Sequence, residues 1–245
     1  MYGNISNSNI IVLICFCTWW STCIVKSLGA GEQCIEGVYH KSRPTPETAE
    51  YEFCKPWKNL TCCTTQLDNE VAKNDAPLKY NDTWHLCGNL SANCLQFWKQ
   101  QECFYQCSPY VYMWKNPLYK GAIKDVPICA EDCDAWYNAC RDDLICVENV
   151  LEDYNKTVNY RKACPNTPGC IKYSQMYGSG KNLCTKMWGD SYKYVQKNGD
   201  NCMKFWFDRN SPNPNAKVDS SSMKSAPENF LMLIVVSIIY NVVKF

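Results

Sequence analysis

Sixteen cysteines lie between Cys34 and Cys202, and their density constrains the fold more than any other feature of the chain. The chain has 19 cysteines in 245 residues, and the other three (Cys15, Cys17 and Cys23) precede this stretch. Cytosolic thiols are kept reduced, so this cysteine content indicates export and a framework of disulfides. Sixteen cysteines allow eight bridges, but sequence spacing alone leaves their pairing open.

Apolar segments at both ends of the chain are typical of processing signals. Residues 10–20 (IIVLICFCTWW) have the length of a signal-peptide core and are too short to cross a bilayer as a helix. Near the other end, small residues at 219–222, a polar spacer and the apolar run 230–243 match a GPI-attachment signal. That run rises about 21 Å as a helix, short of the roughly 30 Å hydrocarbon core.

These end segments divide the chain into three parts. We expect residues 1–30 to be a signal peptide, 31–219 to be the mature domain, and 220–245 to be a GPI signal that is removed. A short membrane anchor is the alternative for the tail. Four N-x-Ser/Thr sequons predict surface glycosylation at Asn59, Asn81, Asn89 and Asn155.

Charge and motifs exclude several classes of function. The chain has 25 Lys plus Arg against 24 Asp plus Glu, so no basic surface for a nucleic-acid partner is indicated. His40 and His85 are the two histidines, and the sequence contains no HExxH, GxSxG or Gly-rich phosphate loop. An even cysteine set leaves no obvious free thiol for catalysis. We therefore expect neither an enzyme nor a metal or cofactor site.

Three segments have helical patterns. Residues 91–107 follow a possible Ser91 cap and end before Pro109, and residues 130–146 place Cys129, Cys133 and Cys140 on one face. Residues 183–195 give a third helix, whereas 51–65, 169–177 and the segment after Cys202 are predicted to be irregular or short-stranded. Few segments show helical or strand periodicity, so we expect the disulfides to stabilise much of the fold.

A series of motifs in a fixed order is specific enough to indicate a family. The motifs are 54–57 (CKPW), 61–64 (TCCT), 87–88 (CG), 103–109 (CFYQCSP), 126–136 (VPICAEDCDAW), 206–208 (WFD) and 213–215 (NPN). Together they resemble the folate receptor and riboflavin-binding protein family, from Cys34 to about Asn215.

The resemblance implies a compact, disulfide-rich α+β domain of several helices and short strands with a pocket for a vitamin. The GPI-like tail is similar to that of cell-surface folate receptors. The resemblance also implies eight disulfides: Cys34–Cys62, Cys54–Cys103, Cys63–Cys107, Cys87–Cys170, Cys94–Cys140, Cys129–Cys202, Cys133–Cys184 and Cys146–Cys164.

A flat heteroaromatic ligand needs aromatic walls and a few polar groups at its edge. The resemblance assigns seven positions to this pocket: Tyr80, Trp84, Gln101, Tyr105, Trp188, Ser191 and Tyr192. The alternative for any of these aromatic residues is that it only packs on disulfides.

The polar anchors of a folate pocket are mostly replaced. Gln101 stands where folate receptors have an Asp, and an amide lacks the strength of a charge-assisted hydrogen bond. Leu118, Tyr119 and Ala122 occupy the Trp-Arg…Arg loop, and 151–154 (LEDY) replaces a basic stretch. Hydrogen bonds to charged groups contribute about 1.5–3 kcal/mol each, so folate affinity should fall by orders of magnitude.

We therefore expect a non-enzymatic, GPI-anchored binding protein on the extracellular face of the plasma membrane. Its partner would be a flat vitamin-type ligand (folate, flavin or related), with weak or altered folate binding. The alternative is a cell-surface protein-recognition or adhesion receptor that has lost vitamin binding.

Overall fold

The computed structural model describes residues 33–80, 82–156, 162–196 and 201–218. The predicted signal peptide and GPI signal, and the sequon at Asn81, lie outside these residues. Within the described ranges, no helix is long and apolar enough to cross a membrane. The strands are β1 (His40–Thr45), β2 (Thr61–Cys63), β3 (Val126–Cys129), β4 (Leu144–Ile145), β5 (Asn155–Lys156), β6 (Lys162–Ala163), β7 (Ile171–Lys172) and β8 (Tyr192–Val195).

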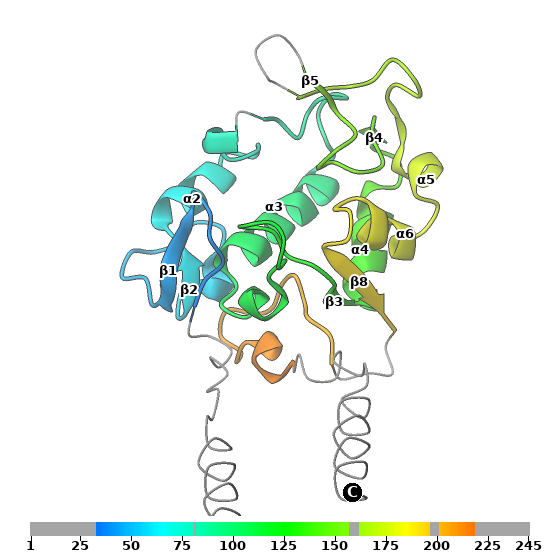
Figure 1. Cartoon of the computed structure of the whole chain (residues 1–245). Helices are drawn as coiled ribbons and strands as arrows, with labels where there is room; N and C mark the ends of the chain where they lie inside the picture. The colour runs from blue at the N-terminus through cyan, green and yellow to red at the C-terminus, as the bar shows by residue number, and fades with distance from the viewer. Residues whose placement is uncertain (1–32, 81, 157–161, 197–200, 219–245) are drawn as a thin grey trace, which may run out of the picture.

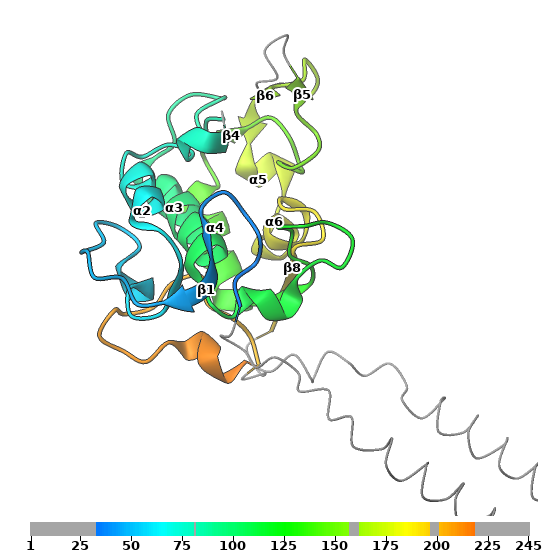
Figure 2. The same cartoon turned by 60° about the vertical axis from the view of Figure 1, so that its left-hand side comes forward.

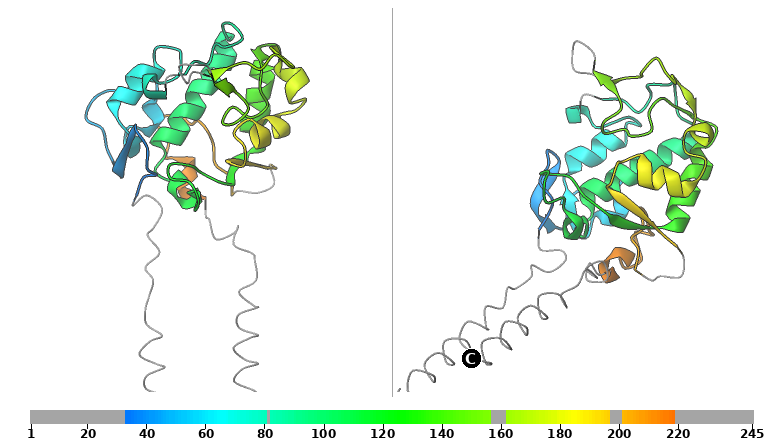
Figure 3. Two further views of the ribbon diagram at one scale, coloured as in Figure 1. Left: turned by 45° about the horizontal axis from the view of Figure 1, so that its top comes forward. Right: turned by 45° about the vertical axis from the view of Figure 1, so that its right-hand side comes forward.

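The helices are α2 (Thr65–Val71), α3 (Ala92–Cys107), α4 (Ala130–Cys140), α5 (Tyr173–Met176) and α6 (Gly180–Lys186). Helix α3 is the longest of them and lies in the middle of the domain (Figure 1). The strands β1 and β2 and helix α2 lie on one side of it, and α4, α6 and β8 lie on the other (Figure 3). Short 3-10 turns occur at Lys55–Trp57, Leu78–Tyr80, Val111–Trp114 and Pro214–Lys217.

The local sequence explains where α3 begins and ends. The Ser91 side chain accepts a hydrogen bond from the Cys94 backbone N–H at 3.3 Å, which satisfies one of the free donors of the first turn. No Gly or Pro interrupts the helix, and Pro109 follows it, which disfavours continuation. The predicted helix at 91–107 is confirmed.

Two other predicted helices differ from the structure. Helix α4 ends at Cys140, not at 146, because Leu144 and Ile145 pair with β7. The predicted helix at 183–195 is wrong beyond Lys186: Gly189 has a φ of +57°, and 192–195 form β8. Strand β8 pairs in parallel with β3, so tertiary pairing outweighs the helical spacing of Met187, Trp188 and Tyr192.

The sheets of the domain are small. In the described residues the strands form four two-stranded sheets, of which β3–β8 is parallel and β1–β2, β4–β7 and β5–β6 are antiparallel. The β5–β6 hairpin projects from the rest of the domain (Figure 2). The mixture of helices and short strands confirms the α+β class.

The eight disulfides of the structure are the eight pairs that the family resemblance implies. The adjacent Cys62 and Cys63 are bridged to different partners, Cys34 and Cys107. Three bridges end on α3, at Cys94, Cys103 and Cys107. One bridge typically contributes 2–4 kcal/mol, so these covalent links compensate for the scarcity of regular sheet.

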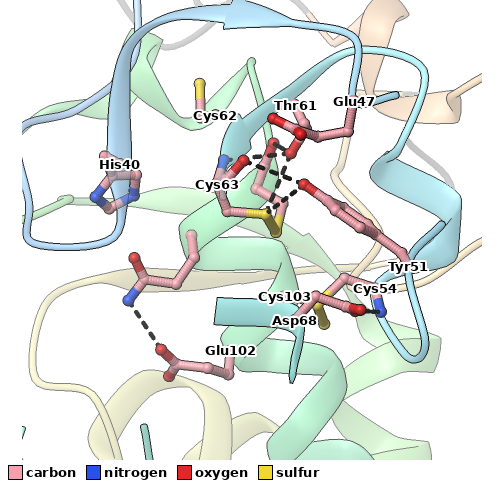
Figure 4. Close-up of a disulfide and its surroundings, with 12 residues drawn as sticks. His40, Glu47, Tyr51, Cys54, Thr61, Cys62, Cys63, Asp68, Glu102 and Cys103 are labelled. Atoms are coloured by element: carbon pink, nitrogen blue, oxygen red, sulfur yellow. Dashed lines mark hydrogen bonds between the residues drawn. A yellow bond between two sulfur atoms is a disulfide. The ribbon is translucent and has the colours of Figure 1, made fainter. Parts of the chain in front are cut away.

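A buried carboxylate on α2 organises the turn that leads to one of these bridges. Asp68 has no solvent exposure, and its oxygens accept hydrogen bonds from the backbone N–H groups of Glu52, Phe53 and Cys54. Figure 4 shows Asp68 next to Cys54, which is bridged to Cys103 of α3. Because one carboxylate accepts from three backbone N–H groups, the Asp68 side chain fixes the conformation of the turn at residues 52–54.

We expect Asp68→Ala to lower the free energy of unfolding by about 3 kcal/mol, because it leaves buried N–H groups without acceptors. Asp68→Asn, which keeps one carbonyl oxygen, should lose about half as much. Guanidinium denaturation with the disulfides intact measures both. A loss below about 1 kcal/mol for Asp68→Ala would show that water or a shifted backbone satisfies these donors.

Candidate functional site

One face of α3 carries most of the side chains of interest. Five residues recur at helical spacing and project from the same side of the helix, because each has another member three or four positions away. They are Trp98, Gln101, Glu102, Tyr105 and Gln106. We call these five residues the α3 face. Each of them contacts a side chain or backbone group from another segment, and the contacts divide into a polar part and an aromatic part.

The polar part consists of two amides and a carboxyl group. Gln101 Nε2 donates to the Tyr192 hydroxyl at 2.8 Å, and Gln106 Nε2 donates to Glu102 Oε1 at 2.8 Å and to the Tyr80 hydroxyl. Gln101, Glu102 and Gln106 are all nearly fully buried. The carbonyl oxygens of the two amides are buried without a hydrogen-bond partner among the described residues. Unpartnered buried polar atoms are costly, so this part of the α3 face has spare hydrogen-bonding capacity.

The aromatic part is centred on Trp98. Its ring centroid lies 5.7 Å from that of Trp84 and 5.7 Å from that of Trp188. Its indole N–H donates to the Tyr173 hydroxyl at 3.0 Å, which fixes the ring orientation. Trp84 and Trp188 are half-buried, and the Trp188 indole nitrogen has no partner in the described part of the chain. The indole ring is thus a wall with an unused donor at its edge.

Tyr105 and Ser191 complete the predicted set. The half-buried Tyr105 donates from its hydroxyl to the Gly121 carbonyl, and its ring meets His40 edge-on with centroids 5.5 Å apart. Ser191 lies buried directly before β8, and its carbonyl accepts from the Val126 N–H at 2.9 Å. Ser191 therefore also fixes the start of the strand that carries Tyr192.

The structure places the predicted residues around the α3 face. Gln101 and Tyr105 belong to it, Tyr80 and Tyr192 bind its amides, and Trp84 and Trp188 pack against Trp98. Sequence reasoning missed Trp98, Glu102 and Gln106. Trp98 lies three residues before Gln101, Glu102 three before Tyr105 and Gln106 four after Glu102, and this spacing in a predicted helix is the signal that could have found them.

A cavity of about 770 Å³ lies elsewhere, and none of the seven predicted residues lines it. It is bounded by the segments 33–42 and 112–122, and Leu118, Tyr119 and Ala122 are among its lining residues. Leu118 is 80% exposed and Tyr119 is 67% exposed. This loop thus presents the side chains of Leu118 and Tyr119 to solvent. Its link to the α3 face is the Tyr105–Gly121 hydrogen bond.

The acidic stretch at 151–154 has a cation beside it. Glu152 and Asp153 are exposed, as a repulsive rim would require. Lys162 donates to the Val150 carbonyl at 3.0 Å, forms an ion pair with Asp82 at 2.8 Å and lies 5.1 Å from the centre of the Tyr154 ring. Lys162 therefore ties the β5–β6 hairpin to the loop that carries Trp84.

Burial controls the protonation of two groups near the α3 face. Burial raises the pKa of Glu102 to about 7, although hydrogen bonds from Gln106 and Tyr80 partly oppose this shift. Burial also lowers the pKa of His40 to about 4, so its imidazole is neutral at neutral pH. Near neutrality Glu102 is the group of the α3 face that changes charge.

Glu102→Gln tests this assignment through the pH dependence of stability. In the folded state Glu102 keeps its proton up to a pKa of about 7, whereas in the unfolded chain the same carboxyl group has its ordinary pKa of 4.5. The wild type should therefore lose stability as the pH rises from 4.5 to 7, and the variant should lack this loss. We expect the variant to gain up to about 3 kcal/mol over the wild type at pH 7.5 and little at pH 4. Urea denaturation across this pH range measures the difference, and a constant difference at all pH values would contradict it.

Comparisons with known proteins identify the family of the chain. Residues 33–204 match the model of the folate receptor family. The chain is 39% identical over 160 residues to the riboflavin-binding protein of Gallus gallus and 40% identical over 160 residues to that of Dromaius novaehollandiae. Each match covers 65% of this chain and 66% of the relative, just under two thirds of its length. Folate receptor gamma of Homo sapiens is 32% identical over 191 residues, which cover 76% of this chain and 77% of the relative.

The matched region contains all the helices and strands of the structure except the final 3-10 turn. These relatives are named as binding proteins and receptors, not enzymes. The eight disulfides, the α+β architecture and the family match lead to one conclusion: this chain belongs to the folate receptor family.

Proposed function

We propose that the α3 face and its aromatic neighbours bind a flat, uncharged heteroaromatic ligand of the flavin type, and that folate binds more weakly. One observation carries this proposal. Among the described residues, the amides of Gln101 and Gln106 have unpartnered oxygens on the helix that also carries Trp98 and Tyr105. The indole N–H of Trp188, whose ring packs on Trp98, has no partner either. A planar ring system with alternating donors and acceptors at its edge complements such a set.

The chemistry of the edge favours a flavin over a pterin. A flavin ring presents one N–H between two carbonyl oxygens, which an amide side chain and an indole N–H can both serve. A folate pocket relies on a carboxylate and guanidinium groups, and this chain has Gln101, Tyr119 and Ala122 at those positions. The similarity is also higher to riboflavin-binding proteins, at 39–40% identity, than to a folate receptor, at 32%.

The cellular setting is part of the proposal. Eight disulfides are maintained in an oxidising compartment, which supports secretion. Asn59, Asn89 and Asn155 are exposed, so each sequon is accessible to a glycan. We infer a glycoprotein held at the outer surface of the plasma membrane by a GPI anchor after the mature domain, with residues 1–30 and 220–245 removed.

The apolar loop at 117–121 favours a second candidate function, recognition of another cell-surface protein. Leu118 and Tyr119 are largely exposed beside the 770 Å³ cavity, and exposed apolar groups at a concave surface are typical of interfaces. Under this alternative, Leu118→Ser with Tyr119→Ser would abolish adhesion between cells that carry the protein and partner cells. The same variant should leave vitamin titrations unchanged.

Riboflavin titration tests the main proposal. Stacking against Trp188 should quench the fluorescence of riboflavin, and folate should bind at least about 100-fold more weakly. Trp188→Ala should weaken riboflavin binding about 10-fold through the loss of one aromatic wall. Trp206→Ala is the matched control, because Trp206 packs on Phe53 and has no contact with the α3 face among its ring pairs. Nanomolar folate binding, or equal losses in the two variants, would contradict the proposed site.

Release by phospholipase tests the anchor. Phosphatidylinositol-specific phospholipase C should release the protein from intact cells, because a GPI-anchored chain has no peptide in the bilayer. Mass spectrometry of the released chain should end near residue 219. Retention on the cells with residues 230–243 still attached would favour a peptide anchor.

A further inference from the structure

Two of the eight disulfides are packed against each other. The sulfurs of Cys87–Cys170 and Cys146–Cys164 all lie within 4.8 Å of one another. Cys87 Sγ is 3.7 Å from Cys164 Sγ, and Cys164 Sγ is 3.9 Å from Cys170 Sγ. These distances are contact distances between sulfurs that are not bonded to each other. The four atoms form a cluster of metal-ligand size, but a sulfur in a disulfide is not a thiolate ligand.

The cluster is open to solvent at one corner. Cys170 is exposed, Cys87 and Cys164 are half-buried, and Cys146 is buried. The rate of thiolate attack on a disulfide depends on access to the sulfur that is attacked. Here Cys170 is an exposed residue, and the second disulfide is in contact with the first.

We propose that Cys170 is a site of S-thiolation and that these four cysteines form one unit of thiol–disulfide exchange. A small external thiolate attacks Cys170 Sγ, breaks the Cys87–Cys170 bond and releases the Cys87 thiolate. That thiolate attacks Cys164 Sγ, forms Cys87–Cys164 and releases the Cys146 thiolate. Attack by Cys146 on the mixed disulfide at Cys170 forms Cys146–Cys170 and returns the external thiol. The net change is an isomerisation that needs no oxidant or reductant.

The exchange would affect Trp84, which packs on Trp98 of the α3 face. Cys87 belongs to the loop that carries Trp84, and Cys164 directly follows β6, whose Lys162 is paired with Asp82 of the same loop. In the native pairing this loop is bridged to the start of β7, and after exchange it is bridged to the end of β6. The packing of Trp84 on Trp98 therefore depends on which pairing is present.

Mild treatment of the folded protein with glutathione tests the proposal. After acid quenching, alkylation and digestion without reduction, mass spectrometry should find glutathione on Cys170 and a Cys87–Cys164 peptide. Both should rise with glutathione concentration while the six other bridges stay in their native pairs. A double variant, Cys146→Ser with Cys164→Ser, is the matched control: Cys87 should then appear as an alkylated thiol.

Three outcomes would overturn the proposal. One is an alkylated Cys87 in the wild type with Cys146–Cys164 still intact. Another is random pairing of all sixteen cysteines, which would reflect unfolding. The third is no reaction at Cys170 at concentrations that modify an exposed disulfide in a reference protein. The wild-type time course gives these results whether or not the double variant folds.

Discussion

Three disulfides on a single helix hold the candidate site in place. Cys94, Cys103 and Cys107 tie α3 to α4, to the turn after Tyr51 and to β2, so both ends of the helix are covalently fixed. The small sheets could not position α3 alone, because two-stranded pairs contribute little independent stability. With its backbone fixed, the α3 face can change side chains without moving the helix. A side chain such as Gln101 is therefore held in place by a backbone that does not depend on it.

The α3 face combines aromatic rings with a polar part whose burial lowers the stability of the domain. Buried amides with unused oxygens and a buried carboxyl group destabilise the unliganded domain, as burial of Glu102 and its pKa of about 7 indicate. A ligand that supplies the missing hydrogen bonds would offset part of this destabilisation. Without a ligand, the disulfides provide the stability that keeps the domain folded. The proposed exchange of Cys87–Cys170 concerns a different wall of the same region, so ligand binding and disulfide pairing would affect each other through Trp84.

Much of the framework could be predicted from the sequence, because cysteines and turn residues encode it locally. The helix at 91–107 follows from Ser91 and Pro109, and the ordered motifs indicate the family fold. The strand at Tyr192–Val195 could not be predicted, because its partner β3 is distant in sequence. Gly189, which ends the helical pattern with a positive φ, was the local sign that the helix stops before this strand. Glu102 and Gln106 have no motif of their own, and only the helix of α3 brings them onto one face with Gln101 and Tyr105. The contact between two disulfides has no sequence signature at all.

The long reach of two bridges affects how the chain acquires its fold during synthesis. Cys87 has to wait for Cys170, which is 83 residues later, and Cys129 for Cys202, which is 73 residues later. The three bridges between Cys34 and Cys107 can close as soon as that stretch has left the ribosome, but β3 has no strand partner until β8 emerges. Contacts between such distant segments form slowly and leave thiols exposed to wrong partners. The order in which the cysteines appear along the chain therefore lets the bridges between Cys34 and Cys107 close before those that need Cys170 and Cys202.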